Sequence, residues 1–229
     1  MASTDDTFRG FCKGCVAAPE RCPLAGNMTA EQLEQSLYAM MEDLKENPIP
    51  VIDKELPGGG MLIDYSLVKG IFFKMLYFPF TWPATAAAIA GVAAGSADAL
   101  MGLGAGGEGG NEAQFGIKCG DVLQHADKLA DIKPILEARH KLSWFGDAAD
   151  QVLAQCARWK LPAKERFDGD FSKVKSKNPI LVVNNRHDPV TPLASARNVS
   201  ETFEGSVLLE QNNYGVSDIP LDLVYGLYG

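Results

Sequence analysis

The chain has 229 residues, of which 46% are hydrophobic and 22% charged, a composition that supports a folded core and excludes wholesale disorder. Its formal net charge of −8 provides no basic surface for a phosphate backbone, so nucleic acid is excluded as the main partner. Met1 is followed by polar and acidic residues without an apolar stretch, so we recognise no signal peptide in this chain.

The predicted elements begin with a loop region over residues 1–27, which is rich in Cys, Gly and Pro. An amphipathic helix is expected from Thr29 to Glu46, because Thr29 and Gln32 form a capping-box pattern and the apolar residues that follow share one face. Residues 48–60 contain several Pro and Gly residues and predict a second loop.

A helical block is expected next. Residues 75–97 carry no charge and are long enough to span a bilayer, but Pro79 and Pro83 interrupt them and much of the rest is Ala, Gly and Thr. We therefore expect a buried or half-buried helix that begins near Pro83, and no membrane segment. The helices predicted in this block cover approximately residues 65–77, 83–100, 112–130, 132–140 and 147–160, with a Gly-rich break at 102–110.

The pattern changes near Lys173, where a β-α-β unit is expected. Residues 180–183 form a continuous aliphatic run after a breaker, which predicts a buried parallel strand. Thr191 and Pro192 suit the cap and first turn of a helix that runs to about Phe203, and residues 206–210 predict a second strand. A right-handed crossover of this kind is typical of an α/β sheet, so we assign the chain to the α/β class.

The best candidate for chemistry is Asp188, which follows the first predicted strand of this unit. Open α/β sheets place functional groups at the carboxyl ends of their strands, and a carboxylate there can orient an imidazole. The alternative is a structural turn, since Asp-Pro is common in turns.

The segment NPILVVNNRHDPVTPLASARNVSETFEGSVLLEQNNYG closely resembles the end of the tripeptidyl aminopeptidase-like serine hydrolases, which are relatives of proline iminopeptidase in the α/β-hydrolase superfamily. The upstream segments FCKGCVAAPERCPLAG, IFFKMLYFPFTWP, KCGD and CARWKLP also look like this family. The resemblance implies four regions: a Cys-rich lead-in at 1–28, a helical lid at 29–172, the C-terminal part of the hydrolase core at 173–215, and a non-family tail at 216–229.

The resemblance also implies a chemistry. Asp188 corresponds to the acid of the family's catalytic triad, the parent reaction is hydrolysis of peptide bonds near free N-termini, and neither a metal nor an organic cofactor is needed. It makes disulfides between Cys119 and Cys156 and between Cys15 and Cys22 plausible, although sequence alone cannot fix the pairing. A peptide is the implied partner, and the family is secreted. The sequons at Asn27 and Asn198 agree with secretion.

Two parts of the triad have no counterpart in the sequence. No G-x-S-x-G elbow occurs, and Ser96 lacks both the second Gly and a preceding strand, so the nucleophile is expected upstream of Met1. The family places its histidine directly after a Tyr-Gly pair, where this chain has Val216. His187 lies on the wrong side of the acid, and surface or packing roles are expected for His125 and His140.

We therefore expect a serine-hydrolase fragment that is inactive by itself, with a non-catalytic peptide-binding or interaction fragment as the alternative. A weaker alternative is nucleotide binding through the G-x-G-x-x-G pattern at 102–107, which lacks the strand that a dinucleotide fold requires. A zinc site built from Cys12, Cys15 and Cys22 is a further alternative, and it lacks a fourth nearby ligand.

Overall fold

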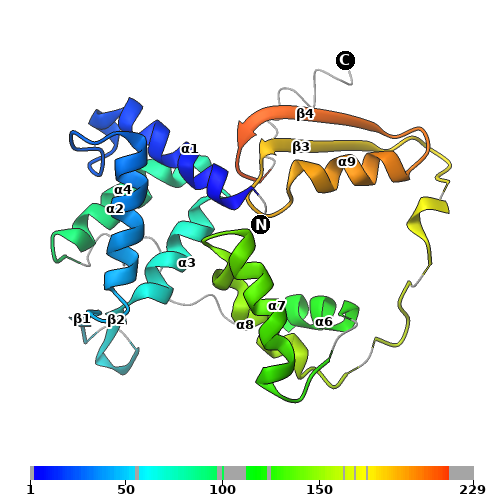
Figure 1. The fold of residues 1–229 in the computed structure, drawn as a ribbon, viewed down its shortest axis with the longest axis horizontal. Helices are drawn as coiled ribbons and strands as arrows, with labels where there is room; N and C mark the ends of the chain where they lie inside the picture. Colours follow the sequence, from blue (N-terminus) through cyan, green and yellow to red (C-terminus); the bar gives the residue numbers. More distant parts are fainter. Residues whose placement is uncertain are drawn as a thin grey trace.

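The computed structural model describes residues 3–216, apart from 55–56, 97–99, 101–111, 123–124, 162, 168 and 174. The Gly-rich break, the pattern proposed for nucleotide binding and most of the predicted tail lie outside these residues. Three groups of elements follow one another along the chain (Figure 1). In order they are α1 (Thr4–Ala17), α2 (Ala30–Asp43), β1 (Ile49–Ile52), β2 (Gly60–Ile63), α3 (Tyr65–Met75), α4 (Trp82–Ala93), α6 (Glu112–Asp121), α7 (Leu129–Leu142), α8 (Asp150–Ala157), β3 (Leu181–His187), α9 (Leu193–Thr202) and β4 (Val207–Tyr214).

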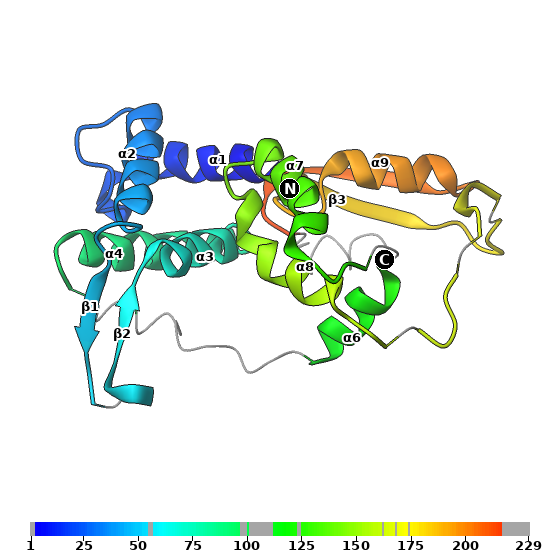
Figure 2. The same ribbon diagram turned by 60° about the horizontal axis from the view of Figure 1, so that its bottom comes forward.

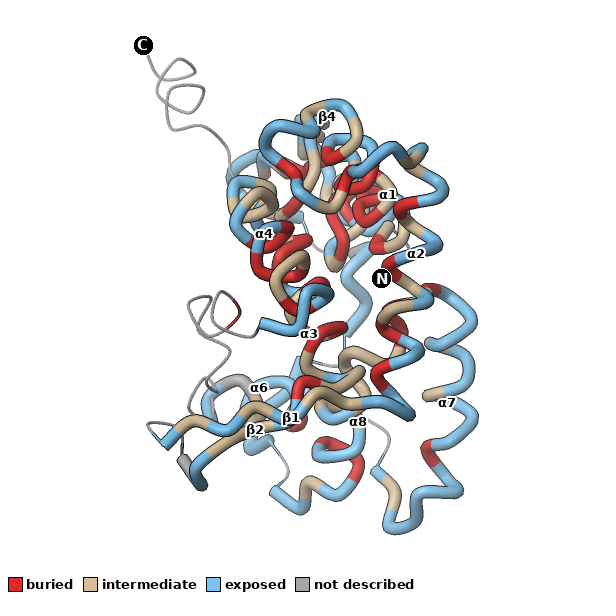
Figure 3. The backbone as a smooth tube through the Cα atoms, turned by 90° about the vertical axis from the view of Figure 1, so that its left-hand side faces the viewer, coloured by how far each residue is buried: buried red, intermediate tan, exposed pale blue. Residues whose placement is uncertain are grey.

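Helix α1 corrects the prediction of a loop over residues 1–27. Phe8, Phe11, Cys12 and Cys15 recur at helical spacing and are all buried, which gives α1 an apolar face. The Cys and Gly residues in this segment indicated a loop, but here the apolar periodicity decides the structure. The buried residues of α1 to α4 form the main core (Figure 3).

Helix α2 confirms the predicted capping box. The backbone N–H of Gln32 donates to Thr29 Oγ1 at 3.2 Å, and the Thr29 N–H donates to Gln32 Oε1 at 2.9 Å. The loop predicted at 48–60 is wrong in part, because Ile49–Ile52 pairs antiparallel with Gly60–Ile63. Gly58 and Gly59, with φ of 85° and 79°, provide the reversal that lets the flanking residues pair.

The helices predicted near 65 and 83 are confirmed as α3 and α4, with Pro83 in the first turn of α4. Helix α4 ends at Ala93, earlier than predicted, and Gly95 follows it with a φ of 84°. Among the described residues, no helix combines the length and apolar character that a membrane crossing requires. The long helix predicted at 112–130 is shorter, since α6 ends at Asp121.

A buried lysine joins α3 to the segment that follows α7. Lys69 is only 3% exposed, its Nζ lies 2.6 Å from Asp147 Oδ1, and the ammonium sits 3.7 Å from the centroid of the Trp144 ring. Asp5 of α1 contacts the same segment, accepting hydrogen bonds from the Ser143 hydroxyl at 2.7 Å and the Trp144 N–H at 3.1 Å. These contacts hold α1, α3 and the end of α7 together.

The closing β-α-β unit confirms the α/β assignment. Strands β3 and β4 pair in parallel, with Leu181 opposite Val207 and Val183 opposite Leu209, and α9 runs along one side of them (Figure 2). The expected burial of the first strand is wrong. Leu181, Val207 and Leu209 are 51%, 61% and 42% exposed, and by strand alternation they lie on one face. No other described element covers that face, so its aliphatic side chains meet solvent.

Candidate functional site

Asp188 lies in a turn at the carboxyl end of β3 and is fully buried. Its Oδ1 accepts hydrogen bonds from the backbone N–H groups of Val190 at 2.9 Å and Thr191 at 2.7 Å. Its Oδ2 accepts one from the Thr191 hydroxyl at 2.6 Å. A carboxylate has about four lone-pair sites, so one site on Oδ2 is left for a further donor.

The start of α9 differs from the prediction in a way that serves Asp188. Thr191 was expected to cap the helix and Pro192 to occupy its first turn. Instead Pro192 takes the cap position, α9 begins at Leu193, and the Thr191 side chain turns back to the carboxylate. Thr191 bonds to Asp188 instead of capping the helix, because a buried carboxylate without donors costs more free energy than a helix end that water can reach.

Helix α1 packs against this turn through two buried threonines. Thr4 Oγ1 donates to the carbonyl of Pro189 at 2.6 Å, and Thr7 Oγ1 donates to the carbonyl of His187 at 2.9 Å. These contacts join residues more than 175 positions apart, and no local sequence pattern predicts them. The residues on either side of Asp188 are thus fixed from a distant segment.

The end of β4 meets the same turn. The Gly215 N–H donates to the His187 carbonyl at 3.1 Å, and Asn185 Nδ2 donates to the Gly215 carbonyl at 2.9 Å. Gly215 has a φ of 85°, and a Cβ on it would lie 2.5 Å from Pro79 Cδ. Only glycine fits here, so the residue after it, Val216, is directed by a tightly fixed backbone.

Tyr77 connects Val216 with the acid. Its carbonyl accepts a hydrogen bond from the Val216 N–H at 3.0 Å. Burial raises the pKa of the Tyr77 phenol, and the negative charge of Asp188 raises this pKa further. The hydrogen bond from Val216 and the charge effect of Asp188 both involve Tyr77, so the acid and the residue after Gly215 lie near the same side chain.

The rings of the three histidines have partners other than Asp188. The His187 ring stacks on Tyr214, with centroids 4.6 Å apart and planes at 20°. His125 Nδ1 lies 3.3 Å from the Cys156 carbonyl, and His140 Nε2 lies 2.7 Å from Asp150 Oδ2. Within the described ranges, none of these rings is hydrogen-bonded to Asp188. The predicted packing and surface roles therefore agree with the structure.

Ser96 does not occupy a nucleophile position. It follows Gly95, two residues beyond the end of α4, and its N–H donates to the Gly91 carbonyl at 2.9 Å. The strand that must precede a nucleophile elbow is replaced here by a helix.

The cysteines form two of the suggested pairs. The sulfurs of Cys15 and Cys22 and those of Cys119 and Cys156 lie within bonding distance, which uses two of the three sulfurs needed for the zinc alternative. Cys12 is a buried free thiol whose pKa is raised by burial to about 12. In the part of the chain that the structure describes, no His, Cys, Asp and Glu side chains gather into a possible metal site.

The family model described as TAP-like protein matches residues 141–219. No curated protein matches the chain. The match begins at the end of α7, inside the predicted lid, and includes Asp188 and β4. Residues 141–219 are thus similar to the C-terminal part of the TAP-like α/β-hydrolases, in agreement with the resemblance.

Proposed function

We propose that Asp188 is the acid of a Ser-His-Asp triad, and that this chain is the acid-bearing part of a serine hydrolase that cleaves peptide bonds near free N-termini. The observation that carries the proposal is the buried Asp188 carboxylate at the carboxyl end of a parallel strand, next to the end of β4, with one lone-pair site left. The family match over this region supports the reaction class.

In such a triad the acid holds the histidine in one tautomer and stabilises the imidazolium that forms when serine attacks the scissile carbonyl. The donors on Asp188 fix the direction of its remaining lone pair. Position 216 is the natural place for the histidine, because Gly215 is hydrogen-bonded to the residue before Asp188 and Val216 to Tyr77, whose pKa the charge of Asp188 raises. A valine at this position provides no donor.

The chain as it stands therefore does not hydrolyse peptides. Its sequence has no G-x-S-x-G elbow, and the position beside the acid carries an aliphatic side chain. A complete enzyme requires a serine and a histidine from residues other than those described. Without the serine and the histidine, Asp188 cannot accelerate peptide hydrolysis.

A fluorophosphonate probe tests the absence of a nucleophile. The full chain should show neither stoichiometric labelling at a serine nor release of chromophore from an N-terminal tripeptide substrate. Labelling of a serine in the native chain that phenylmethylsulfonyl fluoride blocks, and that unfolding abolishes, would contradict this part of the proposal.

The role of Asp188 can be tested without a nucleophile. In the variant Val216→His, NMR titration should find the pKa of the introduced imidazole above the ordinary histidine value, because the neighbouring carboxylate stabilises its charged form. Adding Asp188→Asn should return that pKa toward the ordinary value. The control is Asp127→Asn, which removes an exposed carboxylate that pairs with Lys160 on the surface. An unchanged titration in the Asp188→Asn background would count against the acid role.

A second candidate function is a non-catalytic interaction fragment, favoured by the exposed aliphatic face of β3 and β4. Parallel sheets are normally covered on both faces, so a side formed by Leu181, Val207 and Leu209 suits a further polypeptide. Cross-linking in solution that maps to this face, together with an unshifted imidazole in Val216→His, would favour this function.

We further propose that the protein matures in an oxidising compartment and carries glycans. Two cysteine pairs at disulfide distance support the compartment, and Asn27 and Asn198 are both exposed, as glycosylation requires. Expression in a secretory host, followed by glycosidase treatment, should reduce the apparent mass. An unchanged mass would remove the glycan part of the proposal.

A further inference from the structure

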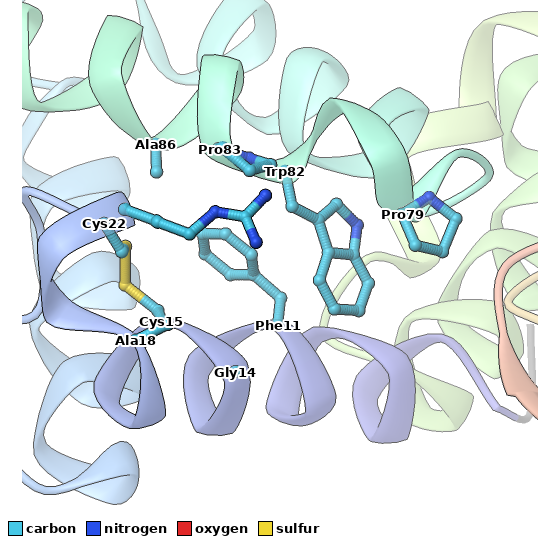
Figure 4. Close-up of a pocket in the computed structure, with 10 residues that line it drawn as sticks. Phe11, Gly14, Cys15, Ala18, Cys22, Pro79, Trp82, Pro83 and Ala86 are labelled. Atoms are coloured by element: carbon cyan, nitrogen blue, oxygen red, sulfur yellow. A yellow bond between two sulfur atoms is a disulfide. The ribbon is translucent and has the colours of Figure 1, made fainter.

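A pocket of about 170 Å³ lies between α1 and α4 (Figure 4). Phe11 and Gly14 of α1 line one side, and Trp82 and Pro83 of α4 line the other. The Cys15–Cys22 pair closes one end. Its lining is apolar with a single exception, Arg21.

The walls of the pocket are fixed. The Trp82 indole N–H donates to the Met75 carbonyl at 3.1 Å, and its ring meets the buried Phe11 ring edge-on, with centroids 5.7 Å apart and planes at 84°. The bond between Cys15 and Cys22 prevents the segment after α1 from moving away. A preformed apolar pocket loses little entropy when a ligand enters it.

Gly14 keeps the pocket open. A Cβ at this position would lie 4.0 Å from Trp82 Cζ3, which is ordinary contact, and any longer side chain would project into the space between the two helices. Gly14 itself is exposed, so it lies at the mouth. A larger residue here would therefore fill the pocket without disturbing the core.

Arg21 gives the pocket its polarity. It is the one charged residue of the lining, it is exposed at the mouth, and none of the ion pairs among the described residues includes it. In a chain of net charge −8, an uncompensated guanidinium beside an apolar cavity is complementary to a carboxylate attached to an apolar group.

We propose that this pocket binds the C-terminal residue of a short peptide, with a hydrophobic side chain between Phe11 and Trp82 and the terminal carboxylate on Arg21. The size agrees, because an apolar cavity of about 150 Å³ holds a group as large as benzene, whereas a long acyl chain needs more room. The open mouth at Gly14 lets the rest of the peptide continue into solvent. The proposal stands independently of the proposed catalytic function, since binding needs no nucleophile.

Isothermal titration of the full chain with Ala-Ala-Leu, Ala-Ala-leucinamide and N-acetyl-leucine tests the ligand class. The tripeptide acid should bind saturably, and its amide about tenfold more weakly because it lacks the charge that faces Arg21. N-acetyl-leucine should bind as well as or more weakly than the tripeptide. Equal affinity of acid and amide, clearly tighter binding of N-acetyl-leucine, or no binding of any of the three would overturn the proposal.

Variants locate the site. Arg21→Gln should weaken binding of the tripeptide about tenfold, and Gly14→Leu should abolish it by filling the cavity. Lys13→Gln is the matched control, because it removes one exposed positive charge from α1 outside the lining and should change affinity less than twofold. Circular dichroism verifies that each variant is folded. A loss in Lys13→Gln equal to that in Arg21→Gln, or full binding by Gly14→Leu, would place the ligand elsewhere and refute the site.

Discussion

Replacing Asp188 by alanine should destabilise the protein strongly. The carboxylate is fully buried and accepts three hydrogen bonds, from the N–H groups of Val190 and Thr191 and from the Thr191 hydroxyl, at 2.6 to 2.9 Å. A hydrogen bond to a charged group contributes about 1.5–3 kcal/mol, and a buried donor left without a partner costs about 1–3 kcal/mol. Because the turn can relax and admit water, we expect a loss of about 3–4 kcal/mol rather than the full sum.

Urea unfolding followed by circular dichroism measures this loss as a lower midpoint at unchanged slope. The midpoint of Asp188→Asn should lie between those of the unaltered protein and Asp188→Ala, since its single amide oxygen can still accept some of the three hydrogen bonds. Asp127→Ala is the matched control, because its carboxylate is 71% exposed and pairs with Lys160, which is 64% exposed. A surface ion pair of this kind contributes little to stability, because solvent screens it.

Equal shifts of the midpoint in Asp188→Ala and Asp127→Ala would contradict this expectation. A lower stability of Asp188→Asn than of Asp188→Ala would also contradict it, since a residual acceptor should stabilise the turn. Either result would mean that the backbone and α1 hold the turn at the end of β3, and that the Asp188 carboxylate does not stabilise it.

Four further predictions follow from single features. Without reductant, the denatured chain should titrate one thiol, Cys12, and after reduction all five. Gly215→Ala should cost about 1–3 kcal/mol in urea, because its φ of 85° and the approach to Pro79 exclude a Cβ. Burial raises the pKa of Asp147, but hydrogen bonds from Lys69 and Tyr65 outweigh burial and hold this pKa below the ordinary aspartate value. The stability that the ionised Asp147 contributes is therefore fully present above the ordinary pKa and is lost as the pH falls through the lowered pKa of the folded state. Asp147→Asn should accordingly flatten the acid limb of stability against pH. Leu209→Lys should reduce self-association in sedimentation runs, because Leu209 lies on the exposed aliphatic face of the sheet.

Local sequence signals were sufficient for several elements. The capping box at Thr29 and Gln32 predicted the start of α2, because both hydrogen bonds form between residues three apart. The aliphatic run before Asp188 and the breaker after it predicted β3, the turn and α9 for the same reason. Parallel pairing was predicted from the continuous aliphatic run of the first strand and the β-α-β order of the elements.

Other features depended on partners distant in the sequence. Helix α1 was expected to be a loop, since its Cys and Gly residues suggested a break, yet Phe8 and Phe11 pack into a core to which α2, α3, α4 and Phe145 contribute. Strand β3 was expected to be buried, since its residues are aliphatic, yet burial depends on a neighbour and no described element covers that face.

The sequence by itself determined that a carboxylate stands at the end of a strand, because strand, turn and acid are contiguous. Only the tertiary structure decided what surrounds it. Thr4 and Thr7 fix the turn from the other end of the chain, and Gly215 brings the end of β4 beside it. Contacts between residues so far apart depend on how whole elements pack, and no local sequence pattern predicts that packing.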